Sequence, residues 1–328
     1  MKALMPSSSP LRDVSRTGLD ALIDAYPFKP YRQYRAFSRR AQRAILLNDV
    51  NAVLGIDGEF SQALDGVAPR AAVLGRRLPW DSDYFGLSMG RLDAVLTVPE
   101  ATAVDRRLVI EGAIDAARAQ GLQHLTARVD IGDLETLRVL EAVGFRTMDV
   151  LATYMLRLGI DTPRAVRRVG SARPVRPEDA EALLAITGEA YAGYRGRFHL
   201  DPHIDPRRAD GFYVEWVRQA VAGTMANSIM VSEDADGRVI GYLTMRQRQP
   251  APTVATLIYG SGLGACRRDA PGAYASIIHE SALRAAAEHP GAVAECQTQV
   301  ANFAVIRIYE SVGFRLARAE FTLHAWLG

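Results

Sequence analysis

The sequence repeats a short motif about half a chain length apart. Residues 140–146 read LEAVGFR and residues 309–315 read YESVGFR, so five of the seven positions are identical. Self-similarity at a fixed offset is typical of a duplicated structural unit. The chain has 328 residues, which is enough for two domains that each bury a core. We therefore predict two related domains.

The two copies of the motif differ at one chemically important position. Tyr309 in the second copy carries a phenolic hydroxyl, whereas its counterpart Leu140 cannot donate a proton. We therefore predict that the second copy performs chemistry and that the first has kept only the fold. A tyrosine on an amphipathic helix is, taken alone, more typical of core packing, and that alternative stays open.

Composition narrows the class of protein. A hydrophobic content of 48% with 23% charged residues is typical of a globular protein, and a net charge of +2 argues against a dedicated nucleic-acid binder. Two cysteines, Cys266 and Cys296, are too few for a disulfide framework, and no Cys/His cluster predicts a metal. No apolar run is long enough for a signal peptide or a membrane span, so we expect a cytoplasmic protein without a membrane partner.

The pattern of apolar residues predicts an α/β fold, a mixed sheet with helices on its faces. Residues 71–78 and 89–98 are predicted strands, PWDSDYFG at 79–86 a loop between them, and Gly121 the residue that ends the following helix. The second half repeats this order and adds a hairpin that turns at Asp236 and Gly237.

The predicted domains follow from composition shifts. Residues 1–50 form an N-terminal helical extension, whose basic amphipathic helices either dock on the body or touch a membrane surface or nucleic acid; docking is favoured. The stretch 159–171 loses apolar periodicity and contains proline and glycine, so we place the boundary there. The domains are then 51–160 and 171–328.

Three features of the second domain indicate a ligand-binding or catalytic site: a loop that precedes a helix, Asn302 and Tyr309. The loop GACRRDAPGAY runs directly into a predicted helix at 272–289, and unpaired N–H groups at a helix N-terminus bind phosphate. Arg267 and Arg268 stand in this loop, where they are equally consistent with ordinary surface arginines. Asn302 is a good N-cap for the helix that carries Tyr309.

These residues resemble a known family. The pattern of the GCN5-related N-acetyltransferase (GNAT) superfamily is matched by Asn302, Ala304, Tyr309, Glu310, Gly313 and Phe314, which follow a strand, a small-residue loop and a helix. Segments 79–92, 196–224 and 241–246 are also similar to the branch that acetylates amino groups of nucleotide-linked amino-deoxy sugars. The resemblance covers roughly residues 70–328 and implies tandem GNAT-like domains, the N-terminal one (51–160) degenerate and the C-terminal one (171–328) catalytic.

The resemblance implies acetyl-CoA as cosubstrate, with no metal, and Tyr309 as the general acid that protonates the departing CoA thiolate. The cofactor-binding residues that it implies are Leu263, Arg267, Arg268, Gly272, Ala273, Tyr274 and Asn302. The diphosphate loop fits in two registers. One places Asp269 where Gln or Arg is usual and Tyr274 at the second glycine; the other starts at Arg267 and places Ala270 and Gly272 at the small positions.

Acceptor binding is expected in the segment 194–216, which combines aromatic and arginine side chains. The expected acceptor-binding residues are Arg197, Asp201, His203, Tyr213 and Arg246. Tyr213 and Trp216 lie three residues apart on one helix face, so at least one should pack in the core. Candidates for the base that deprotonates the amine are Asp201, His203, Glu215 and Glu295.

The expected activity is acyl-CoA-dependent N-acylation, with acetyl as the acyl group. A primary amine would attack the thioester in a ternary complex, and a backbone N–H of the strand at 258–263 would stabilise the oxyanion. The expected acceptor is a nucleotide-linked amino-deoxy sugar. Alternatives are another small amine (a natural-product amino sugar, an aminoglycoside or a polyamine) or a non-catalytic acyl-CoA-binding protein. A homodimer is possible, and nucleic acid is not an expected partner.

Overall fold

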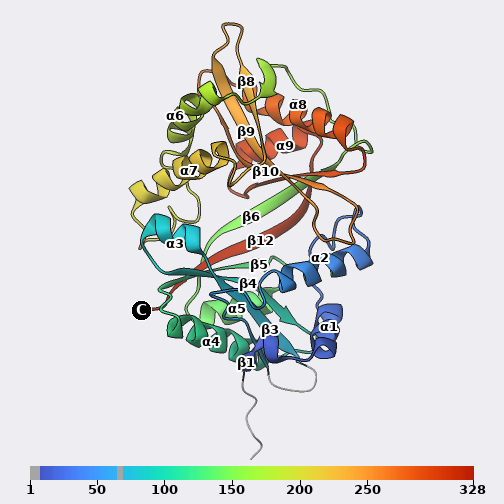
Figure 1. Cartoon of the computed structure of the whole chain (residues 1–328), viewed down its shortest axis with the longest axis vertical. Coiled ribbons are helices and arrows are strands. Elements are labelled where there is room, and N and C mark those ends of the chain that lie inside the picture. Colours follow the sequence, from blue (N-terminus) through green and yellow to red (C-terminus); the bar gives the residue numbers. More distant parts are fainter. Residues whose placement is uncertain (1–7, 65–68) are drawn as a thin grey trace, which may run out of the picture. The chain divides into compact units, whose positions relative to one another are not determined.

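The computed structural model describes residues 8–64 and 69–328, so the first seven residues of the predicted N-terminal extension lie outside the described residues. The chain forms two compact units (Figure 1). Unit 1 runs to Asp149 and includes Glu320–Gly328, and unit 2 is Val150–Ala319. The chain therefore changes unit within two strands, β6 (Arg146–Arg157) and β12 (Arg315–Trp326).

Unit 1 is a mixed sheet with helices. Its strands follow the order β1-β2-β3-β4-β5-β12, and all neighbours are antiparallel except β4 and β5. The elements are β1 (Ser8–Pro10), a 3-10 turn (Leu11–Asp13), α1 (Arg16–Ala25), α2 (Arg39–Asn51), β2 (Gln62–Leu64), β3 (Ala71–Arg77), α3 (Pro79–Phe85), β4 (Met89–Thr97), α4 (Ala103–Ala119), β5 (His124–Asp130) and α5 (Leu134–Ala142).

The prediction of a loop at 79–86 is wrong, because these residues form the helix α3. Pro79 stands in its first turn, where the missing N–H has no helical partner to lose, and Asp81 complements the positive end of the helix dipole. Gly86 ends the helix in the left-handed conformation, with φ of 63°. These are ordinary signals for the start and the end of a helix. The helix has only 7 residues, which is too short for a helical period to be recognised in the sequence.

The N-terminal helices belong to the core of unit 1. Leu19 and Leu22 of α1 pack with Leu46 of α2 against the strand residues Leu74 and Leu96. A second cluster on the other side of the strands joins α4 and α5 to the sheet, with Val109 and Leu140 at 0% exposure. The prediction that residues up to 50 dock through an apolar face is therefore confirmed for the described part, and the sheet is covered on both faces.

Unit 2 has the same kind of architecture. Its strands follow the order β6-β11-β10-β9-β8-β7, with only β10 and β11 parallel among neighbours. The elements are β7 (Ser171–Pro174), a 3-10 turn (Pro177–Asp179), α6 (Ala180–Tyr191), α7 (Pro206–Val221), β8 (Ser228–Glu233), β9 (Val239–Arg248), β10 (Ile258–Cys266), α8 (Ala273–Glu288), β11 (Val293–Gln299) and α9 (Phe303–Val312). The predicted hairpin turn is confirmed, with Gly237 at φ of 78°.

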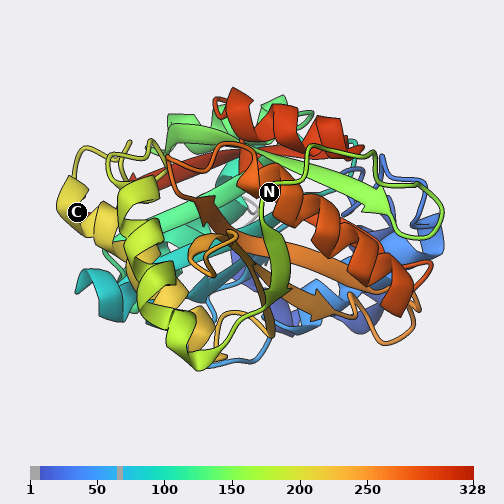
Figure 2. The same ribbon diagram turned by 90° about the horizontal axis from the view of Figure 1, so that it is seen from above.

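Alternating side chains of the unit 2 strands point to two helix layers. Val231 and Tyr242 pack with α6 and α7, whereas Met230 and Leu243 pack with α8 and α9. Figure 2 shows α6 and α8 on different sides of these strands. The period of two along a strand therefore divides unit 2 into an α6/α7 face and an α8/α9 face.

The offset that relates Leu140 to Tyr309 holds far beyond the short motif. Strand β10 (Ile258–Cys266) begins and ends at this same offset from β4 (Met89–Thr97), and the offset also relates β11 to β5 and β12 to β6. The equivalents of α2, residues 208–220, fall within α7. The chain is thus a tandem duplication, as predicted, and α2 is the counterpart of α7.

The closing strands explain why the two units differ from the predicted boundaries 51–160 and 171–328. Residues 151–157 of β6 pair with β11 in unit 2, and residues 320–326 of β12 pair with β5 in unit 1. Each repeat therefore pairs its β5-type strand with the last strand of the other repeat. The segment 159–171 lies inside unit 2 rather than at its edge.

Candidate active site

The two parallel strands of unit 2 separate partway along their length. Residues Ile258–Gly260 of β10 pair with Val293–Glu295 of β11, and the pairing stops there. Beyond this point β10 continues on β9, with an irregular register between Ser261 and Gly264, while β11 continues on β6. We call the space between the strands beyond Gly260 and Glu295 the wedge. Such openings at the carboxyl ends of parallel strands are common ligand sites.

Tyr309 lies beside the wedge. Asn302 caps α9 by accepting a hydrogen bond from the Val305 N–H at 3.4 Å, which confirms its predicted capping role. Tyr309, two turns on, is 2% exposed and donates its hydroxyl proton to the Gln297 carbonyl of β11 at 3.2 Å. Burial raises the pKa of Tyr309 well above its ordinary value, and the nearby Tyr274 raises it further. The phenol is therefore held in its protonated form.

Three more polar side chains line the start of the wedge. The Ser261 hydroxyl on β10 lies 3.1 Å from the Cys296 sulfur on β11. Burial raises the pKa of Cys296 to about 12, so this residue is a neutral thiol. Tyr274, in the first turn of α8, packs its ring against Gly264: a Cβ atom at Gly264 would lie 2.7 Å from it. The glycine is needed for this close approach.

The N-termini of the equivalent helices α4 and α8 differ in chemistry. In α4, Thr102 and Asp105 form a capping box, and Arg70 also contacts the Asp105 carboxylate at 3.5 Å. Helix α8 starts after Gly272, at φ of 93°, and no side chain in the described part of the protein caps it. Unit 1 thus already holds a carboxylate at the positive end of this helix, whereas unit 2 leaves that end available to an anion.

The acidic residue of the loop before α8, Asp269, is paired with arginines. Arg267 holds Asp269 through two contacts of 3.0 and 3.3 Å, and Arg238 adds a third at 3.4 Å. The hydrogen bond from Arg267 lowers the pKa of Asp269. Arg268 is 77% exposed and lies 3.5 Å from Glu189. Both predicted phosphate ligands, Arg267 and Arg268, therefore already have acidic partners.

Two further arginines lie next to α8. The sequence did not predict either of them as a ligand. The backbone N–H of Val169 donates to the Ser276 hydroxyl of α8 at 3.3 Å, and the Ser232 hydroxyl donates to the Val169 carbonyl at 3.2 Å. These bonds fix the segment that carries Arg167 and Arg168. Both arginines are exposed, and neither forms an ion pair with any residue that the structure describes. Only the Arg-Arg pair itself could have drawn attention to them.

Glycines of β10 let other side chains lie close to the strand on the α6/α7 face of the wedge. A Cβ atom at Gly260 would lie 3.8 Å from the Glu295 carboxylate, so that carboxylate lies over Gly260. Glu295 is 8% exposed and 3.5 Å from Arg248 of β9. At Gly262 the neighbouring ring is that of Trp216, 2.5 Å from the position of a Cβ atom. Glu295 is the one predicted base candidate on a strand that borders the wedge.

The predicted acceptor segment divides into buried and exposed residues. Tyr213 is 9% exposed and stacks on Tyr191 at 4.5 Å, in a cluster with Tyr194 and His199, so it is a core residue. One face of its ring is covered by Tyr191. This confirms that at least one of Tyr213 and Trp216 packs in the core.

The other predicted acceptor and base residues take varied positions. The Arg197 guanidinium lies 4.5 Å from the Phe198 ring. Asp201 is 2% exposed and accepts a hydrogen bond from the N–H of the exposed His203 at 3.0 Å. A hydrogen bond from Gln219, assisted by Arg218, lowers the pKa of Glu215. Arg246 is exposed on β9, opposite Gly260.

The remaining predicted cofactor residues surround the same helix end. The Leu263 carbonyl on β10 accepts a hydrogen bond from the Thr244 hydroxyl at 2.8 Å. Gly272 and Ala273 adjoin the start of α8, and Ala273 is fully buried. The structure therefore brings Leu263, Gly272, Ala273, Tyr274 and Tyr309 together around β10, α8 and α9 of unit 2.

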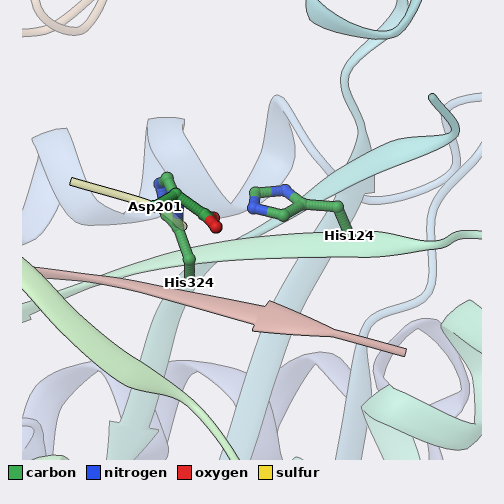
Figure 3. Close-up of side chains that lie close together, drawn as sticks. All are labelled: His124, Asp201 and His324. Atoms are coloured by element: carbon green, nitrogen blue, oxygen red, sulfur yellow. The ribbon is translucent and has the colours of Figure 1, made fainter. Parts of the chain in front are cut away.

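Unit 1 has a polar pair of its own. The rings of His124 on β5 and His324 on β12 pack edge to face at 4.6 Å, and both residues are almost fully buried (Figure 3). Asp201, which Figure 3 also labels, belongs to unit 2. At the offset that relates Leu140 to Tyr309, the counterparts of His124 and His324 are Val293 and Met155, and both belong to unit 2. Two imidazoles can bind a metal but do not by themselves define a metal centre.

Most of unit 2 matches a known domain family. Residues 172–315 match the model of the acetyltransferase (GNAT) domain. The chain therefore contains a GNAT acetyltransferase domain. A tandem GNAT protein from the clavulanic acid biosynthesis pathway has a similar fold, with a TM-score of 0.55, 16% identity and 99% of each chain covered. Among the described residues, no helix is both long and apolar enough to cross a bilayer.

Two curated proteins are similar to this chain in sequence. The spore coat polysaccharide biosynthesis protein SpsD of Bacillus subtilis is 27% identical over 155 residues, which are 47% of this chain and only half of SpsD. The dTDP-fucosamine acetyltransferase of Escherichia coli is 23% identical over 253 residues, 75% of this chain and 96% of that protein.

Proposed function

We propose that the chain is an acyl-CoA-dependent N-acetyltransferase whose catalytic unit is unit 2. The observation that carries this proposal is the contrast between two equivalent sites. Unit 2 combines the wedge, the Tyr309 phenol and an uncapped α8 N-terminus. Unit 1 has Leu140 in place of the phenol and a carboxylate at the α4 N-terminus. A capping carboxylate and a leucine would serve neither CoA binding nor proton transfer.

The cosubstrate would bind with its phosphates at the start of α8. Backbone N–H groups there carry partial positive charge, and Gly272 allows a diphosphate to approach the backbone closely. Arg167 and Arg168 would supply full positive charges, because they are exposed and not engaged by a described acidic residue. The pantetheine would then run along β10 into the wedge, which brings the thioester sulfur toward Tyr309.

The chemistry would proceed by direct transfer. The amine nitrogen attacks the thioester carbonyl carbon, and the carbon–sulfur bond breaks as the carbonyl re-forms. Tyr309 gives its proton to the departing thiolate, for which its hydroxyl must leave the Gln297 carbonyl. Glu295 takes the proton that the amine loses, from the α6/α7 face of the wedge. Holding both reactants together supplies much of the rate enhancement.

The acceptor would be the amino group of a nucleotide-linked amino-deoxy sugar. The name of the E. coli relative states that it acetylates such a compound, dTDP-fucosamine, and the name of SpsD refers to polysaccharide synthesis. On this chain, the exposed Arg246 and its neighbour Arg248 lie on β9 at the α6/α7 face. Guanidinium groups pair well with a diphosphate, so these two side chains suit the nucleotide part of the acceptor.

The test is a thiol-release assay with the whole chain and acetyl-CoA. The acceptors would be a dTDP-linked 4-amino-sugar, the same amino sugar without nucleotide, and a polyamine. The proposal expects release with the nucleotide sugar and much slower release with the other two. Faster release with the polyamine would contradict the acceptor. Absence of both release and thermal stabilisation by acetyl-CoA would contradict the enzyme assignment as a whole.

A further inference from the structure

A bulge interrupts β10 directly beyond the start of the wedge. The register of β10 on β9 slips by one residue between Ser261 and Gly264, so Gly262 and Leu263 together stand opposite Thr244. Bulges are frequent next to active sites, where they end strand pairing or redirect a side chain. The bulge lies on the strand along which we place the pantetheine, so a thioester in the wedge would lie against it.

The α6/α7 side of this bulge is covered by Trp216 of α7. A Cβ atom at Gly262 would lie 2.5 Å from the indole ring and 2.6 Å from the Thr244 hydroxyl. The ring is partly buried, and it packs against the apolar cluster that joins α6 and α7 to the sheet. Any group that lies on the bulge from this side therefore meets the indole, and a larger one would have to displace it.

The wedge is also closed toward α8. The Ser261 hydroxyl of β10 lies 3.1 Å from the Cys296 sulfur of β11, so these two side chains meet across the gap between the strands. Both line the side of the sheet that faces α8, and Tyr309 packs on the same side. An acyl chain in the wedge is therefore confined between this contact and the indole of Trp216.

The geometry of a thioester directs its acyl chain toward Trp216. The carbonyl carbon is trigonal, so the sulfur and the carbon chain leave it in different directions. In the proposed reaction Tyr309 reaches the sulfur from the α8/α9 face. The carbon chain then points toward the α6/α7 face, where the indole covers Gly262. Each methylene added to an acetyl group would bring the chain closer to the ring.

The equivalent bulge of unit 1 carries different side chains. Its extra residue on β4 is Asp93, at the counterpart of Gly262. Arg76 and Arg91 hold the Asp93 carboxylate at 3.2 and 2.8 Å, and Leu47 stands at the position of the indole. Unit 1 thus keeps the bulge without a glycine or an indole. The combination of an indole with a bare glycine occurs in the repeat that has the wedge and the phenol.

We propose that Trp216 is a specificity-determining residue that limits the acyl group to the size of acetyl. This inference rests on the proposed function and adds to it the residue that excludes longer chains. The indole forms the wall of the acyl site on the α6/α7 face. An acetyl group fits below it, whereas a four-carbon chain has to push the ring out of its apolar cluster. Overpacking of this kind costs free energy, so the longer thioester binds less tightly.

The experiment measures by calorimetry the Kd of CoA, acetyl-CoA and butyryl-CoA for the whole chain. We expect the wild-type chain to bind acetyl-CoA about tenfold or more tightly than butyryl-CoA. Trp216→Leu, which copies unit 1, and Trp216→Ala should each bring this ratio toward one and leave the affinity for CoA itself unchanged. Val214→Ala is the control, because it removes bulk from α7 where that helix faces Gly188 of α6, and it should preserve the ratio.

The outcomes separate this inference from the proposed function. A wild-type ratio near one, with CoA still bound, would overturn the limit on acyl length and leave the acetyltransferase intact. A ratio that both Trp216 variants retain would assign the limit to another residue and overturn the inference as well. If Trp216→Ala does not fold, Trp216→Leu alone decides. A chain that binds no CoA species at all would overturn both proposals together.

Discussion

The Tyr309 hydroxyl donates a hydrogen bond to the backbone carbonyl of Gln297, at 3.2 Å, on the part of β11 that has left β10. The bond ties the phenol of α9 to the edge of the wedge. The equivalent residue Leu140 has no polar atom and is fully buried in the core of unit 1. The two equivalent positions therefore differ in chemistry: the Tyr309 side chain has a proton to donate, whereas the Leu140 side chain only packs.

Replacing Tyr309 with Phe should lower turnover about tenfold or more, because the thiolate would leave without a positioned proton donor. Acetyl-CoA affinity should change little, since the ring and its packing remain. Steady-state kinetics with calorimetry measure both. Tyr154→Phe is the matched control: this phenol packs 5.7 Å from Tyr309 but has no proposed role. Equal turnover in wild type and the Tyr309 variant would remove Tyr309 from the mechanism.

The same phenol should make unit 2 sensitive to alkali. Burial raises the pKa of Tyr309 in the folded state above the value near 10 of an unfolded chain. Below pH 10 both states are protonated and stability is unaffected. Above it the unfolded state loses a proton that the folded state keeps, so stability falls by about 1.4 kcal/mol per pH unit for each such group. Denaturant melts between pH 8 and 11 should show a shallower fall for Tyr309→Phe than for Tyr154→Phe.

Removing both Arg167 and Arg168 should weaken CoA binding, because two exposed positive charges beside α8 would be lost. We expect about a tenfold higher Kd at low salt for the double alanine variant and a smaller difference at high salt, where exposed charges are screened. Calorimetry at two salt concentrations measures this. Arg107→Ala, in an exposed pair with Glu111 on α4, is the control for loss of surface charge. Unchanged affinity at low salt would show that the phosphates bind elsewhere.

The sequence indicated the duplication, the order of elements in the second repeat and the GNAT domain. It did so because the Gly-Phe motif and the capping residue Asn302 act locally. It could not show that residues 320–326 pair with β5, because strand pairing depends on distant partners. It also could not show that Tyr213, a predicted acceptor-binding residue, is buried, because one sequence cannot tell a buried aromatic residue from an exposed one. Arg167 lies in a segment whose sequence is typical of a linker, and only the hydrogen bond between Val169 and α8 shows that the segment lies beside that helix.

The capping box of α4 should stabilise unit 1 without serving CoA. Asp105→Ala removes the carboxylate that accepts the Thr102 N–H at 2.7 Å, which should lower the free energy of unfolding by about 1 kcal/mol. CoA affinity should stay at the wild-type value, because the proposed cosubstrate site lies in unit 2. Chemical denaturation and calorimetry measure the two quantities. A change in CoA affinity would show that the α4 N-terminus takes part in binding.

Glu295→Gln should remove the proposed proton acceptor while preserving the size of the side chain. An amine acceptor is mostly protonated at neutral pH, so turnover should fall and its rise with pH should move to higher pH, toward the pKa of the amine itself. Acetyl-CoA affinity should not change, because Glu295 faces the α6/α7 side of the sheet. The pH dependence of kcat/KM measures the effect. Glu215→Gln, on α7 and hydrogen-bonded to Gln219, is the control. If the two variants give the same profile as wild type, the amine loses its proton to another group or to water.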